Sequence, residues 1–133
     1  MWRRCALLVA ILAASPAGAQ KCAELSGAQK LESDRYVVAY QTRPGKVAVG
    51  QHFSMDLIVC AKGKQPAPET LRVDAHMPEH RHGMNYKTTV KPADGGRYQA
   101  DGFMFHMPGR WEFVFELRSG GKTDRVTSSF TLE

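Results

Sequence analysis

The chain has 133 residues, with 18 Lys and Arg against 13 Asp and Glu, which gives a formal net charge of +5 at pH 7. This length is enough for one domain with one hydrophobic core. The basic residues are scattered along the chain and form no stripe with aromatic residues between them, so the sequence argues against a nucleic-acid-binding protein.

Residues 1–19 are typical of a secretory signal peptide. Two arginines at positions 3 and 4 precede an apolar run over residues 5–14, and the Ala-Gly-Ala of residues 17–19 fits a cleavage site. The apolar run is about half of the ~20 residues that a membrane-spanning helix needs. We therefore expect cleavage after Ala19, a mature chain without a membrane span, and a periplasmic or secreted location.

Residues 20–34 form an N-terminal arm in which a few apolar residues stand among polar ones. The sequence leaves open whether this arm is a short helix or an ordered extended segment. Loss of the leader leaves two cysteines, Cys22 and Cys60, and an even number of cysteines in an exported chain favours a disulfide. Free thiols or metal-binding thiols are the alternative.

From residue 35 to residue 133, short runs of β-branched and aromatic residues alternate with turn residues. This pattern predicts an all-β fold, a single immunoglobulin-like antiparallel β-sandwich of about seven strands. The candidate strands are 36–41, 53–60, 71–77, 85–90, 97–105, 111–117 and 126–132. In the strand at 111–117 the large apolar side chains alternate with Glu112, Val114 and Glu116, so we expect Trp111 and its fellow aromatic residues to face the core.

Two segments combine histidine with methionine, one at residues 76–84 and one at residues 106–107. Imidazole nitrogen and thioether sulfur together suit copper, since sulfur favours Cu(I) and nitrogen also accepts Cu(II). Proline follows each His-Met pair and cannot donate to a sheet, so each pair is expected at a strand end. Because the two strands concerned run in the same direction, both ends lie at one pole of the sandwich. The candidate metal ligands are His76, Met77, His80, His82, Met84, His106 and Met107.

The same segments resemble the FixH/YtkA-like family of exported immunoglobulin-like domains. The resemblance lies in Met-Pro-x-His-x-His-Gly-Met at residues 77–84 and in Gly-x-Tyr-x-Ala-x-Gly-Phe-x-Phe-x-Met-x-Gly-x-Trp-Glu at residues 96–112. It extends over about residues 45–132 and implies copper handling outside the cytoplasm, with His80, His82, Met84 and Met107 at matching positions. A cleavable leader here takes the place of the retained membrane anchor of FixH-type members.

Three classes of function follow from these features. The first is a periplasmic copper carrier or buffer that favours Cu(I) over Cu(II) and has a membrane copper pump, an oxidase or another copper acceptor as its partner. The second is an immunoglobulin-like structural or partner-binding module without metal. The third, an enzyme, is disfavoured, because the mature chain would not begin with the histidine that a histidine-brace oxygenase requires and no G-x-S-x-G nucleophile elbow is present.

Overall fold

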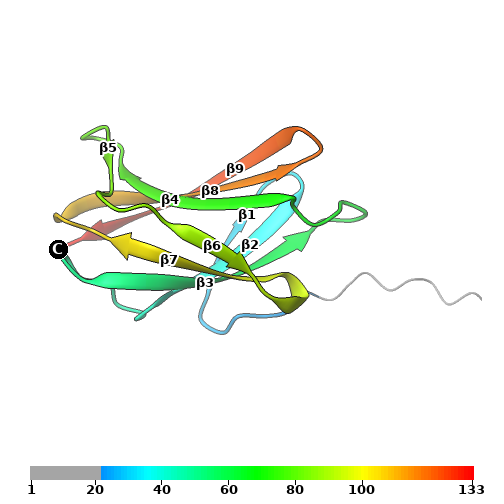
Figure 1. Cartoon of the computed structure of the whole chain (residues 1–133), viewed down its shortest axis with the longest axis horizontal. Coiled ribbons are helices and arrows are strands. Elements are labelled where there is room, and N and C mark those ends of the chain that lie inside the picture. The colour runs from blue at the N-terminus through cyan, green and yellow to red at the C-terminus, as the bar shows by residue number, and fades with distance from the viewer. Residues whose placement is uncertain (1–21) are drawn as a thin grey trace, which may run out of the picture.

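The computed structural model describes residues 22–133, so the predicted leader lies outside the described residues. Two antiparallel sheets pack face to face, as Figure 1 shows. Sheet A has the strand order β1-β2-β3-β7-β6, and sheet B has the order β5-β4-β8-β9. The strands are β1 (Gln29–Glu32), β2 (Tyr36–Arg43), β3 (His52–Ala61), β4 (Thr70–Met77), β5 (His82–Gly83), β6 (Thr89–Pro92), β7 (Arg97–Met104), β8 (Gly109–Ser119) and β9 (Lys122–Leu132). A 3-10 turn at Asp94–Gly96 precedes β7.

The predicted all-β antiparallel sandwich is confirmed, with nine strands in place of about seven. The two extra strands are short. One of them, β1, lies inside the arm at residues 20–34 and pairs with β2, so the sandwich begins before residue 35 and the described part of the arm holds no helix. Within residues 22–133 there is no helix long and apolar enough to cross a membrane.

The strand predicted at residues 85–90 begins later, at Thr89. Residues 84–88 carry the chain from the edge of sheet B to the edge of sheet A, and there the Thr88 hydroxyl donates a hydrogen bond to the carbonyl of Val73 in β4. This side-chain hydrogen bond holds the crossover against sheet B, and the ladder with β7 begins only at Thr89, where the crossover is complete.

The core fills the space between the sheets. The alternation predicted for β8 is confirmed, because Trp111 and Phe115 are fully buried and Phe113 is nearly so. The ring of Phe113 meets those of Phe53, Phe103 and Phe105 across the sandwich, and the indole of Trp111 meets Phe105, with centroids 4.5–6.2 Å apart. An aromatic core of this kind supplies the rigid base on which the loops at each end are held.

Candidate metal centre

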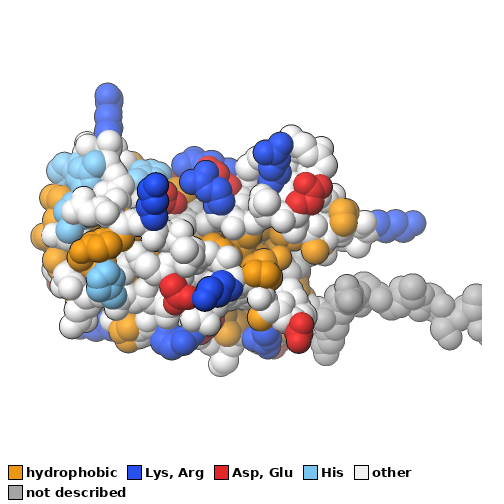
Figure 2. All heavy atoms as spheres, viewed as in Figure 1, with side chains coloured by type: hydrophobic (Ala, Val, Ile, Leu, Met, Phe, Trp, Pro, Cys, Tyr) orange, Lys and Arg blue, Asp and Glu red, His pale blue; other side chains and the backbone are white. Residues whose placement is uncertain are grey.

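The ends of β4 and β7 meet at one pole of the sandwich, as strand parity predicts. β4 ends at Met77 in sheet B, and β7 ends at Met104 in sheet A. Histidine side chains gather at this end of the molecule in Figure 2, close to β5 and the C-terminus as placed in Figure 1. We call this end the histidine pole, and it consists of residues 76–84 together with residues 104–109.

His82 is the centre of a group of three histidines. Its ring centroid lies 5.7 Å from that of His80 and 5.3 Å from that of His106. The indole of Trp111 closes the inner side, with its centroid 6.1 Å from His82 and 5.6 Å from His106. The structure thus brings together histidines from two segments that are 24 residues apart in sequence, counted from 82 to 106.

Trp111 also fixes the backbone of the second segment. Its Nε1 donates a hydrogen bond of 3.0 Å to the carbonyl oxygen of Met107, and its side chain is fully buried. A buried indole N–H needs such a partner, and the bond it makes here holds the 105–108 connection against the core. The position of His106 therefore depends on the core rather than on a free loop.

The Nδ1 atom of His106 is buried and has no hydrogen-bond partner among the described residues. A buried polar atom without a partner costs about 1–3 kcal/mol, and native structures rarely retain one without a reason. An imidazole nitrogen in this state is available as a lone-pair donor to a bound ion. This atom is the strongest local signal of a ligand at the histidine pole.

The spacing of the rings is compatible with a shared ion. A metal binds an imidazole nitrogen at about 2 Å, which places it roughly 3 Å from the ring centroid, so two rings on one ion have centroids up to about 6 Å apart. Both distances from His82 are within this limit. As the side chains stand, however, residues 22–133 contain no group of three His, Cys, Asp or Glu side chains arranged to hold a metal ion.

The methionines of the predicted set divide into two kinds. Met84 and Met107 are half-buried and pack against the edge of the core. Met77 is fully buried, and its methyl group lies where a side chain on Gly109 would begin, 2.6 Å from the ideal Cβ position. Met77 is therefore a core residue here, and the structure does not expose its thioether at the strand end as the sequence predicts.

His76 lies on the other face of β4. It alternates with the buried residues Ala75 and Met77, and its Nε2 lies 3.5 Å from Oε1 of Glu112 on the outer face of sheet B. In the register between β4 and β5, His76 pairs with Gly83 while Met77 pairs with His82, so the rings of His76 and His82 extend to opposite sides of the sheet. The structure does not bring His76 into the histidine group.

An ion pair secures the loop that carries His80, and the sequence does not predict it. Nε of Arg110 in β8 lies 2.8 Å from Oε1 of Glu79, and the same guanidinium donates a 3.3 Å hydrogen bond to the Ser129 hydroxyl of β9. Two hydrogen bonds from the backbone N–H groups of His80 and Arg81 to the Met77 carbonyl close the turn. The pairing of charges 31 positions apart has no local signal in a sequence.

Cys22 and Cys60 are joined as a disulfide, with Cα atoms 5.9 Å apart, within the usual range for such a bond. Cys60 lies near the end of β3, whereas His52 at the start of that strand pairs with Met104 beside the histidine pole. The disulfide is therefore at the opposite pole from the histidines, and its sulfurs take no part in the candidate centre.

Comparison with known proteins identifies a family and solved structures of similar fold. The model of the YtkA-like family matches residues 30–115. A crystal structure of a DUF4426 family protein from Pseudomonas aeruginosa has the same fold, with a TM-score of 0.54, 14% sequence identity, and coverage of 82% of this chain and 97% of that one. No curated protein matches the sequence. Because the family model covers well over half of the chain, including the strands and loops that form the histidine pole, this protein belongs to the YtkA-like family.

Proposed function

We propose that this protein is an exported copper-binding protein, a periplasmic copper carrier or buffer. His80, His82 and His106 would bind the ion, together with the thioethers of Met84 and Met107. The observation that carries the proposal is the buried, unpartnered Nδ1 of His106 in a ring whose centroid is 5.3 Å from that of His82. A bound ion would satisfy this atom without any change in the core.

The donor set favours Cu(I). Thioether sulfur is a soft ligand that prefers Cu(I), and neutral imidazole binds copper in both oxidation states. Neither ligand type carries a charge, so a copper ion held here keeps its own positive charge and can pass to an acceptor by exchange of one ligand at a time. A membrane copper pump, an oxidase or another copper protein outside the cytoplasm is the acceptor we propose, and the role requires no catalytic residue.

The solvent exposure of the ligands supports reversible binding. His80 is exposed, His82 is half-exposed, and His106 is anchored through the Trp111 hydrogen bond. An acceptor could therefore reach the outer ligands first while the inner ligand keeps its place. This graded arrangement suits a carrier or buffer better than a permanent structural metal site, which is usually closed by four protein ligands.

A partner-binding module without metal is the second candidate. It is favoured by the absence, in the part of the chain that the structure describes, of any three His, Cys, Asp or Glu side chains grouped around a metal position. On this reading the histidines would form only a recognition surface. The two candidates differ in one measurable property, which is stoichiometric binding of copper.

Competition with chelators specific for Cu(I) or for Cu(II) tests the proposal. We expect the His80→Ala/His82→Ala variant to lose affinity for both ions by at least tenfold. The matched control is His76→Ala, because His76 lies in the same segment but on the other face of β4. Equal affinities for wild type and the double variant, or equal losses in the variant and the control, would refute the proposed site.

A further inference from the structure

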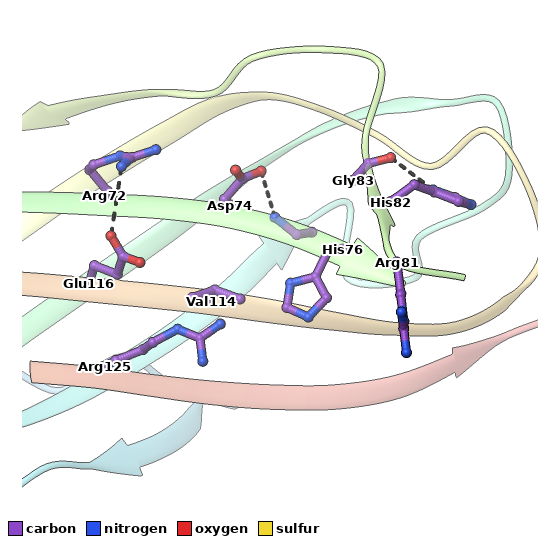
Figure 3. Close-up of a pocket in the computed structure, with 10 residues that line it drawn as sticks. Arg72, Asp74, His76, Arg81, His82, Gly83, Val114, Glu116 and Arg125 are labelled. Atoms are coloured by element: carbon purple, nitrogen blue, oxygen red, sulfur yellow. Dashed lines mark hydrogen bonds and ion pairs between the residues drawn. The ribbon is translucent and has the colours of Figure 1, made fainter. Parts of the chain in front are cut away.

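A groove on the outer face of sheet B begins beside the histidine pole and runs across β4, β8 and β9. Its charged lining includes Arg72, Asp74, His76, Arg81, Glu116 and Arg125. Figure 3 shows the side chains of Arg125, His76 and Arg81 extending to the same side of the sheet, with the imidazole of His76 between the two guanidinium groups. Residues from two strands and one turn thus line the groove, with Arg81 at the end next to the histidine pole and Arg125 in the strand register beside Glu116.

The charged side chains of the groove differ in how they are paired. At the far end, Arg72 lies 3.7 Å from Glu116, and Asp74 accepts a 2.8 Å hydrogen bond from the backbone N–H of Ala75. No ion pair of the described residues involves Arg81, at the near end, or Arg125, which pairs with Glu116 in the strand register. Two guanidinium groups, each with five N–H donors, are left without a carboxylate.

The backbone at Arg81 supports a role for its side chain. Arg81 has a φ of +55°, and it is the one non-glycine residue with positive φ in the part of the chain that the structure describes. This left-handed conformation is unfavourable for a residue with a long side chain, and strain of this kind gathers at ligand sites. The hydrogen bond of 2.9 Å from its N–H to the Met77 carbonyl fixes the turn, and the side chain then extends over the groove.

The carboxylates around the groove have other partners. Glu112 lies 3.5 Å from His76, and its other oxygen accepts a 3.0 Å hydrogen bond from the Ser129 hydroxyl. Glu79, also close by, is paired with Arg110. With Glu112 and Glu79 engaged in this way, and Glu116 paired with Arg72, the guanidinium groups of Arg81 and Arg125 remain for a ligand from outside.

We propose that this groove binds the carboxylates of an acidic segment of a partner protein, held between Arg81 and Arg125. A guanidinium binds a carboxylate through two parallel N–H···O bonds, so two such groups on one groove select acidic side chains over neutral ones. The groove crosses three strands, which gives room for an extended polypeptide rather than for one small ion. Its paired charges at the far end provide polar contacts for the rest of that segment.

The groove lies beside the candidate metal ligands, which connects carboxylate binding with copper transfer. His82 and Gly83 line the end next to β5, and the His82 ring extends to the histidine group on the other side of the sheet. A partner seated in the groove would thus lie beside the candidate metal ligands. The role in copper transfer rests on the proposed function, whereas the binding of carboxylates does not.

Titration of metal-free protein with a hexaglutamate peptide tests the proposal, with a hexaglutamine peptide of the same length as the neutral probe. Backbone amide shifts followed by NMR are expected to change at residues 76–83 and near Arg125, only with hexaglutamate. The Arg81→Gln/Arg125→Gln variant should bind at least tenfold more weakly. Its matched control is Arg97→Gln/Arg118→Gln, which removes the same charge from two exposed arginines outside the groove.

Equal weakening in both double variants would show that only overall charge attracts the peptide and would overturn the proposal. Absence of saturable hexaglutamate binding by the folded wild-type protein would overturn it as well. Citrate is the third probe, and citrate binding at these residues as tight as that of the peptide would replace the partner segment with a small carboxylate ligand. Copper content measured on the Arg81→Gln/Arg125→Gln variant separates the two proposals, because this variant is expected to keep the copper of wild type.

Discussion

His106 combines a well-packed position with an unsatisfied atom, and this combination gives a prediction at the scale of one residue. In metal-free protein, His106→Leu removes the buried Nδ1 that has no partner, which offsets the loss of packing. We expect the free energy of unfolding in the presence of a chelator to change by less than about 1 kcal/mol, while copper binding falls. Urea unfolding measures the first quantity. A loss of stability above about 2 kcal/mol would mean that Nδ1 makes a bond important for the fold.

Met84 and Met107 test how far the site depends on sulfur. Leucine has a similar volume, so Met84→Leu/Met107→Leu preserves the packing at the edge of the core. We expect this variant to lose affinity for Cu(I) by at least tenfold and to keep its affinity for Cu(II) within about threefold, because only the soft ion depends on thioether. Chelator competition in each oxidation state gives both numbers.

The matched control for this pair is Met77→Leu, which changes a methionine of the same segment that lies in the core. It should leave both affinities unchanged. If the double leucine variant holds Cu(I) as tightly as wild type, then Met84 and Met107 serve only as packing and any metal site is built from histidine.

At the scale of elements, Asp124 ties the turn between β1 and β2 to β9. Its carboxylate accepts hydrogen bonds from the Ser33 hydroxyl at 2.6 Å and from Nε of Arg35 at 2.8 Å. The Ser33 hydrogen bond lowers the pKa of the Asp124 carboxyl most; burial acts against it, and the hydrogen bonds from Arg35 lower it further. Arg35 also donates hydrogen bonds to the carbonyl oxygens of Ser119 and Lys122. The side chains of Arg35 and Asp124 therefore join the two sheets at the pole opposite the histidines.

Because the pKa of Asp124 is lowered on folding, the carboxylate stabilises the protein above the pKa of the unfolded chain, and this contribution is lost as pH falls through the folded value. We expect Asp124→Asn to lose about 2 kcal/mol of unfolding free energy at pH 7. The difference from wild type should shrink as pH falls below about 4, where the carboxyl of the unfolded chain takes up a proton first and that of the folded protein follows at lower pH. Urea unfolding across this pH range checks the trend, and a difference independent of pH would contradict it.

The Cys22–Cys60 disulfide joins the start of the described chain to β3, and it gives a second prediction for this pole. Such a bond typically contributes about 2–4 kcal/mol by restricting the unfolded chain. Intact-mass measurement of protein alkylated without reduction should show no added thiol label, and reduction should lower stability without removing copper. Two labels on unreduced, natively purified protein would show that the thiols are free.

The sequence predicted the long strands and the buried face of β8 because alternation records burial directly. It predicted neither β5 nor the late start of β6, since both depend on how the chain crosses between sheets. His76 shows the limit most clearly. It is adjacent to Met77 and beside a real cluster of histidines, yet its alternation with the buried Ala75 and Met77 turns its ring to the outer face, and the register with β5 puts His82 on the other side.

At the scale of the whole molecule, the two poles have separate roles. The disulfide and the Arg35–Asp124 pair secure one pole, while the histidines, the exposed loop of His80 and the adjoining groove lie at or beside the other. The aromatic core connects them and also forms, through Trp111, the inner wall of the candidate metal centre. Changes at the disulfide pole are therefore expected to alter stability, and changes at His80, His82 and His106 to alter copper binding.

Copper content tests the central claim most directly. Protein purified without residues 1–19 is loaded with Cu(I) under anaerobic conditions and dialysed, and copper and protein are then measured on the same sample. The account predicts one copper ion for each wild-type chain and a ratio near zero for a variant in which His80, His82 and His106 are replaced. A wild-type ratio far below one, in protein whose circular dichroism shows an intact β fold, would contradict it.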